Sequence, residues 1–113
     1  MPLQAPAFAA DPTGNWQSTS GESRYNVSYC GDGTQLCAKL TWLREDARTQ
    51  ENLPYLNRYV VKGAVATGKN RWEGKLAYAG DVYSGRVTMV SANAMKLKGC
   101  KGVFCQSMNF VRQ

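Results

Sequence analysis

The sequence predicts an all-β domain, an eight-stranded antiparallel up-and-down barrel. Three observations carry this prediction. From residue 14 onward, apolar and polar residues alternate with a period of two, as in strands that have one dry face and one wet face. Short turns separate the alternating stretches. Glycines also recur on the expected inner face, at Gly63, Gly74, Gly85 and Gly99, where a sheet must bend in order to close.

The predicted strands follow one another in meander order over 14–19, 24–30, 36–43, 59–67, 71–78, 82–90, 94–99 and 103–112. Turns rich in glycine, serine, aspartate and asparagine connect most of them. The link over 44–57 is long and charged, and we expect it to hold a short helical turn or to form a flexible lid. Inward glycines together with large inward aromatic side chains favour a closed barrel over a two-sheet sandwich.

The first ten residues differ in composition from the rest of the chain. Ala7-Phe8-Ala9 has the form of a signal-peptide cleavage site, with cleavage near Ala9–Ala10. We therefore expect residues 1–10 to be the disordered remnant of a signal peptide and residues 11–113 to form a single barrel domain. This interpretation predicts a periplasmic or secreted protein.

The cysteines are even in number, at Cys30, Cys37, Cys100 and Cys105, which in a small exported domain indicates disulfides. Three pairings are possible. We favour Cys30–Cys37 and Cys100–Cys105, because the alternation places each pair on the outer side of one hairpin. A zinc site built from the four thiolates is the alternative, but the gaps of six and four residues differ from the usual knuckle spacing. We predict no metal site and no cofactor.

The composition argues against most catalytic sites. The chain contains no histidine, which removes Ser-His-Asp and Cys-His catalysis. Its carboxylates fall in turns or on outer faces, so no acid–base pair is indicated. The formal net charge of +6 indicates either a soluble exported domain or an acidic partner. Because the aromatic side chains are expected inside the barrel, a stacking surface for nucleic acid is not predicted.

Two sequence features resemble known families. Gly14-Asn15-Trp16 in the first strand, with Phe110-Val111-Arg112 in the last, resembles the closure signature of lipocalin-like barrels. In those barrels the tryptophan plugs one end and the arginine packs over its ring, which implies the pair Trp16 and Arg112 here.

A second resemblance, to the secreted bacterial family catalogued as domain of unknown function 2147, extends over nearly all of residues 14–112. The matching pieces are 14–16, Cys30-Gly31, Leu36-Cys37, 41–43, 72–76, 83–85 and 97–112. The resemblance implies a small exported barrel of the lipocalin or streptavidin kind with no firmly assigned activity. The link at 44–57 is shorter than in that family, and Phe110 stands where tryptophan is more usual.

The predicted function is non-catalytic binding of a small apolar or amphipathic ligand in the barrel mouth. The candidate lining residues are the larger inward side chains, Tyr25, Tyr29, Trp42, Tyr78, Tyr83, Met89, Met95, Gln106 and Met108. In the alternative, the barrel is a solid scaffold that contacts an envelope protein or an anionic polymer. Its contact surface would then be the 44–57 link or the basic outer face, with Lys39, Lys75, Arg86, Lys96 and Lys98. We expect a monomer that does not span the membrane.

Overall fold

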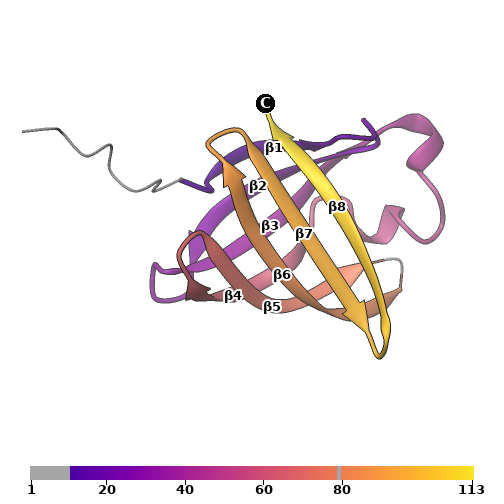
Figure 1. The fold of residues 1–113 in the computed structure, drawn as a ribbon. Helices are drawn as coiled ribbons and strands as arrows, with labels where there is room; N and C mark the ends of the chain where they lie inside the picture. Colours follow the sequence, from indigo (N-terminus) through magenta and orange to yellow (C-terminus); the bar gives the residue numbers. More distant parts are fainter. Residues whose placement is uncertain (1–10, 79) are drawn as a thin grey trace, which may run out of the picture.

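The computed structural model describes residues 11–78 and 80–113, which form a closed barrel of eight antiparallel strands (Figure 1). The strands are β1 (Gly14–Ser18), β2 (Ser23–Cys30), β3 (Gln35–Leu43), β4 (Tyr59–Gly68), β5 (Arg71–Tyr78), β6 (Asp81–Ser91), β7 (Ala94–Lys101) and β8 (Phe104–Arg112). Each strand pairs with its neighbour in the chain, and β1 pairs with β8 to close the barrel.

The predicted fold is confirmed, and every predicted strand boundary lies within two residues of the observed one. The predicted signal remnant over 1–10, with its cleavage point at Ala9–Ala10, lies outside the described residues. In the part of the chain that the structure covers, no helix has the length and apolar character needed to cross a membrane.

A bulge in β3 changes which residues face the interior. Thr41 is an extra residue between the pairs Arg24–Trp42 and Tyr25–Leu40. One extra residue reverses the side of the sheet on which the following side chains lie. Trp42 therefore faces outward, with the guanidinium of Arg24 4.3 Å from its ring centroid. The predicted inward orientation of Trp42 is wrong for this reason.

A second bulge occurs in β4. Gly63 has no partner in the register between Lys62 and Ala64, and its φ is +84°. Glycine adopts this backbone conformation readily, and it is a usual residue at such bulges. After the bulge, Ala64 is buried, whereas Val65 is 53% exposed. Strict alternation would place Gly63 and Val65 on the same inner face, and the bulge explains why Val65 is exposed instead.

The other three inward glycines form a continuous row across β5, β6 and β7. Gly74 pairs with Gly85, and Gly85 pairs with Gly99. The side chain of Leu76 lies over this row, because a Cβ atom added at Gly85 or Gly99 would come 3.3 Å from Leu76. The row allows one large apolar side chain to lie flat against the sheet at the point where it curves.

We expect Gly74→Ala to lower the free energy of unfolding by about 1–3 kcal/mol, the usual effect of overpacking a core. A Cβ atom at this position would lie 2.9 Å from the Cα atom of Ala64, and that backbone atom cannot rotate away. Urea denaturation measures the loss. Gly68→Ala is the matched control, because its Cβ atom would meet only the movable guanidinium of Arg71. Equal losses for the two variants would contradict this account of the β4–β5 contact.

Candidate functional site

One end of the barrel is sealed by Trp16, which is fully buried. Its indole N–H donates a hydrogen bond to the carbonyl oxygen of Pro12 at 3.0 Å. The guanidinium of Arg112 lies 4.4 Å from the Trp16 ring centroid. The same guanidinium donates to the carbonyl oxygens of Asp11 at 2.6 Å and Thr13 at 2.7 Å. Arg112 thus fastens the segment before β1 across the tryptophan, and the end is closed.

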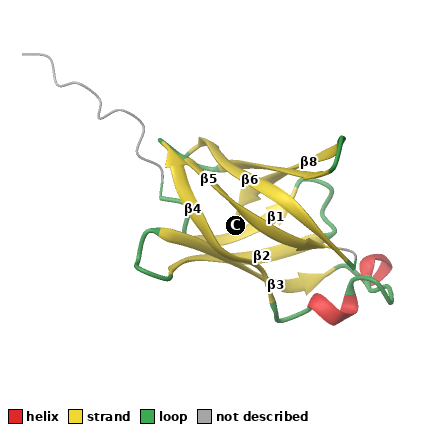
Figure 2. Ribbon diagram, turned by 90° about the horizontal axis from the view of Figure 1, so that it is seen from below, coloured by secondary structure: helices red, strands yellow, loops and turns green. Residues whose placement is uncertain are grey.

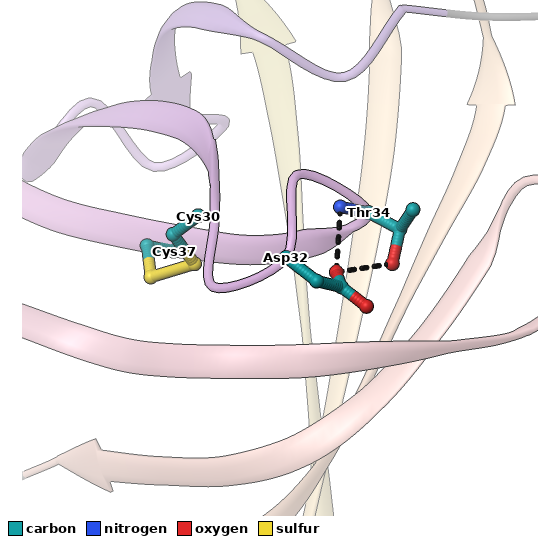
Figure 3. The surroundings of a disulfide bond; sticks show 4 residues. All are labelled: Cys30, Asp32, Thr34 and Cys37. Carbon is teal, nitrogen blue, oxygen red and sulfur yellow. Dashed lines mark hydrogen bonds between the residues drawn. A yellow bond between two sulfur atoms is a disulfide. The ribbon is translucent and has the colours of Figure 1, made fainter.

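The β2–β3 hairpin at this closed end is held by the Cys30–Cys37 disulfide, whose Cα atoms are 5.9 Å apart. Figure 3 shows the adjoining loop, in which the Asp32 carboxylate accepts hydrogen bonds from the hydroxyl and the backbone N–H of Thr34. These hydrogen bonds hold the pKa of Asp32 below its usual value. Both hydrogen bonds go to one carboxylate oxygen and close the turn, so we assign Asp32 a structural role.

The interior beyond Trp16 contains a cavity of about 70 Å³. Its wall is made of aliphatic and aromatic side chains from all eight strands, and its polar groups are tyrosine hydroxyls and the amide of Gln106. Sites that enclose drug-sized ligands usually measure about 300–1,000 Å³. The cavity is therefore too small, in this conformation, to enclose a bulky ring system.

Six of the predicted lining residues come together around the cavity: Tyr25, Tyr78, Tyr83, Met95, Gln106 and Met108. The other three lie elsewhere. Trp42 faces outward because of the β3 bulge. Tyr29 has inward parity but is 45% exposed, because it lies at the end of β2 beyond the Trp16 plug. Met89 is buried in the core near the closed end, without reaching the cavity wall.

Several wall residues were not among the predicted ones. Ala38, Val61 and Leu97 lie on strands whose alternation placed them inward, but only the larger or more polar side chains were selected as candidates. Val60 could not be found by alternation, because the register between β3 and β4 shifts next to it and buries both Val60 and Val61. Counting every inward residue of each strand, and not only the largest ones, would have predicted the aliphatic wall residues.

The cavity reaches solvent at the end opposite Trp16. Gln106 lines the cavity and is also exposed, which places it at the opening. Tyr25, Tyr78 and Tyr83 contribute hydroxyls to the same region of the wall. Burial raises the pKa of Tyr25, and it also raises that of Tyr78. Both phenols therefore stay neutral at physiological pH and can donate or accept a hydrogen bond.

The link between β3 and β4 lies over this open end (Figures 1 and 2). It contains two single-turn helices of the 3₁₀ type, η1 (Glu45–Ala47) and η2 (Leu53–Tyr55). The Tyr55 hydroxyl accepts a hydrogen bond from the backbone N–H of Gly80 at 2.9 Å, which joins the link to the β5–β6 turn. A smaller space of about 20 Å³ beneath the link shares Tyr25 and Tyr78 with the main cavity. The link is thus a cover over part of the mouth.

The second predicted disulfide, Cys100–Cys105, joins β7 to β8 at the mouth end. Nearby, the Lys101 ammonium lies 2.6 Å from the Asp81 carboxylate, and this ion pair is more than half exposed on its lysine side. No group of three potential metal ligands among cysteine, aspartate and glutamate gathers anywhere in residues 11–78 and 80–113. The polar groups of the mouth are suited to hydrogen bonding with a ligand.

Comparisons with known proteins agree with this geometry. A family model described as "Uncharacterized protein conserved in bacteria (DUF2147)" matches residues 14–112. A search of curated proteins finds no match. Among solved structures, protein HP1028 from the human pathogen Helicobacter pylori is described as belonging to the lipocalin family. It is similar to this chain with a TM-score of 0.65 and 15% identity, over 92% of this chain and 84% of that one.

A redesigned β-barrel is also similar, with a TM-score of 0.55 and 11% identity, over 89% of this chain and 90% of that one. At these identities the two structures establish the fold alone. The family match covers all eight strands of the barrel. The chain therefore belongs to the bacterial family of uncharacterised proteins known as domain of unknown function 2147, and it has a lipocalin-like fold.

Proposed function

We propose that this protein is a non-catalytic binding protein that holds the alkyl chain of a small amphipathic molecule inside its barrel. The observation that carries the proposal is the cavity, which is apolar along its wall, closed by Trp16 and open at Gln106. An apolar cavity that is too small for a ring system suits a slender chain. About 0.8 kcal/mol becomes available for each methylene group that leaves water.

The size of the cavity sets the shape of the ligand. At about 70 Å³ it holds only the end of a chain unless its wall moves. Met95 and Met108 form part of the wall, and methionine side chains adapt readily because they are unbranched and flexible. A chain entering from the mouth would displace these side chains and extend the cavity toward Trp16. The remainder of the ligand would stay at the opening.

The polar end of the ligand would meet the mouth groups. The neutral hydroxyls of Tyr25 and Tyr78 can donate to a ligand oxygen or accept from a ligand hydroxyl. The Gln106 amide offers both a donor and an acceptor at the solvent edge. These groups favour an uncharged or singly charged oxygen-bearing head, such as a hydroxyl or a carboxyl group. They provide orientation, while the chain provides most of the affinity.

We also propose that the protein works outside the cytoplasm, in the periplasm or as a secreted protein. Its two disulfides, Cys30–Cys37 and Cys100–Cys105, support this location, because small disulfide-containing domains are typical of oxidising compartments.

Titration with straight-chain carboxylic acids and alcohols of increasing length tests the proposed function. We expect Kd to fall about fourfold per added methylene until the chain fills the barrel, as the transfer free energy of a methylene implies. Calorimetry measures the affinities, and cyclic compounds with the same number of carbons are the matched controls. Failure of every chain to bind at concentrations up to about 1 mM would overturn the proposal, because binding weaker than this is not specific recognition.

A further inference from the structure

The tip of the β7–β8 hairpin exposes two consecutive apolar side chains. Val103 is 90% exposed and Phe104 is 80% exposed, more than any other large hydrophobic residue that the structure describes. Gly102 precedes them with a φ of +61°, as expected at the first central position of a tight hairpin turn. Hairpin turns are normally polar, and exposed apolar residues are normally scattered singly. An adjacent valine and phenylalanine at a tip therefore indicate a surface that is covered in use.

The tip is held in place by covalent and ionic contacts, so the exposure of Val103 and Phe104 is a feature of the ordered hairpin. The Cys100–Cys105 disulfide joins the two strands directly behind the turn, with Cα atoms 4.0 Å apart. Lys101 pairs with Phe104 across the hairpin, and its ammonium is ion-paired with Asp81 on β6. Because these contacts order the tip in advance, little conformational entropy would be lost when the tip binds a partner.

The tip stands beside the opening of the cavity. Phe104 belongs to the same inward row of β8 as Gln106 and Met108, which line the cavity. Figure 1 shows the hairpin at the same end of the barrel as the 44–57 link, with the link across the mouth from it. A surface that covers the tip would therefore lie beside the opening.

The strands that carry the tip are basic on their outer faces. Register places five basic side chains on the outer faces of β5, β6 and β7: Arg71, Lys75, Arg86, Lys96 and Lys98. Glu73 is the acidic side chain among them, and its carboxylate lies 3.7 Å from Arg86. The link across the mouth carries Glu45, Asp46 and Glu51 but also Arg44 and Arg48, and Arg44 is ion-paired with Asp46, so its charges nearly cancel. The hairpin side of the barrel therefore carries the larger positive charge.

We propose that the hairpin tip docks on an anionic lipid bilayer. Val103 and Phe104 enter the boundary between head groups and acyl chains, and the basic outer faces of β5–β7 lie against the anionic head groups. Two apolar side chains alone give weak binding, and stable attachment to a membrane usually needs a second contribution such as basic residues. Both contributions are present on one side of this barrel.

A bilayer fits this surface better than a second copy of the chain. A symmetric dimer through the tip would bring the two positive faces toward each other, and like charges across an interface oppose association. An anionic membrane complements the charge and accepts the apolar tip at the same time. In the docked orientation the barrel lies on the side formed by β5–β7, and the rim of the mouth that carries the tip lies next to the lipids. Entry of a chain directly from the bilayer rests on the proposed function, whereas docking itself does not.

Vesicle co-sedimentation tests the docking. Wild-type protein is expected to bind vesicles of phosphatidylcholine mixed with phosphatidylglycerol, to bind phosphatidylcholine alone more weakly, and to lose affinity as salt is raised. The double variant Val103→Ser/Phe104→Ser is expected to bind the mixed vesicles at least tenfold more weakly. The matched control, Tyr29→Ser/Val65→Ser, removes an exposed aromatic side chain on β2 and an exposed valine on β4, away from the mouth and from β5–β7, and is expected to bind like wild type.

Fluorescence tests separately whether the hairpin tip enters the bilayer. Tryptophan fluorescence of Phe104→Trp is expected to shift to shorter wavelength on vesicle addition and to be quenched by lipids with brominated chains. Wild-type protein provides the background, because it carries the buried Trp16 and Trp72 together with the half-buried Trp42 on the outer face of β3. Equal vesicle binding by both serine variants, or no binding by wild type, would overturn the proposal. So would a wild-type dimer in lipid-free buffer that becomes monomeric in Val103→Ser/Phe104→Ser, because the tip would then cover a second copy.

The failures of docking and of chain binding can be told apart. Titration of Val103→Ser/Phe104→Ser with straight-chain acids in lipid-free buffer is expected to give wild-type affinity. If wild type binds chains but no vesicles, docking fails and the proposed function stands. If wild type binds vesicles through the tip but takes up no chain, the proposed function fails and docking stands.

Discussion

Replacing Trp16 with alanine is expected to lower the free energy of unfolding by about 3–5 kcal/mol, the usual loss for a large aromatic side chain removed from a core. Trp16 has no exposed surface, and it is the floor of the cavity. Its removal would also leave the Pro12 carbonyl and the Arg112 guanidinium without the indole that they contact. For a domain of this size such a loss is a large fraction of the total stability. Urea denaturation followed by circular dichroism measures it.

Trp42→Ala is the matched control for this experiment. Trp42 lies on the outer face, where its main partner is the Arg24 guanidinium. A cation–π contact at an exposed site is worth about 0.5–1 kcal/mol, so the expected loss is about 1 kcal/mol. If Trp42→Ala destabilised the protein as much as Trp16→Ala, the assignment of Trp16 as the plug and of Trp42 as an outer residue would be wrong.

Filling the cavity is expected to abolish most chain binding without harming the fold. Ala38 lies on the cavity wall, and leucine at this position adds three carbon atoms toward the space that a ligand would occupy. At about 0.8 kcal/mol for each displaced methylene, we expect Kd to rise about thirtyfold or more. Filling a void commonly stabilises a protein, so the melting temperature is expected to stay equal or to rise. Calorimetric titration with a straight-chain acid measures the effect.

Ala77→Leu makes the same change on the outer face of β5, beside Val82, and is expected to bind chains like wild type. The comparison separates occupation of the cavity from a general effect of a larger side chain on a strand. Unchanged binding by Ala38→Leu would show that the chain does not enter the barrel, and the ligand site would have to be sought outside it.

Alternation was sufficient to predict the strands, because a barrel with one dry face imposes a period of two on its sequence. The same alternation placed Tyr25, Tyr78 and Tyr83 on the inner face, where they line the cavity. It also put both cysteine pairs on outer faces, where the disulfides lie. These features depend on residues in regular stretches, whose orientation follows from their neighbours.

The errors arose where regularity is interrupted. Trp42 follows the extra residue Thr41, so it was assigned to the wrong face, and alternation would misplace Val65 in the same way because it follows the unpaired Gly63. A glycine within a strand is compatible both with a bend and with a bulge, and only the pairing partner distinguishes them. Strict alternation with Val61 would also place Tyr59 inside, but the register shift at Val60 leaves it 43% exposed beside Lys39.

Alternation also could not predict how far along the barrel axis a side chain lies. Tyr29 has the correct parity yet lies outside the plug, because alternation defines the side of a sheet and not the position of the seal. The hydrogen bond from Gly80 to Tyr55, which fastens the link over the mouth, joins two segments that have no periodic signal. Contacts of this kind depend on the closed shape of the barrel.

The central claim, that the barrel carries a small amphipathic molecule, is tested most directly by native mass spectrometry. The protein would be purified without detergent from the bacterium that encodes it, so that a ligand bound in the cell is retained. We predict a population with the mass of the protein plus one small molecule, which is lost on denaturation and absent from Ala38→Leu prepared in the same way. A spectrum of wild-type protein with the bare mass of the chain alone would contradict the claim.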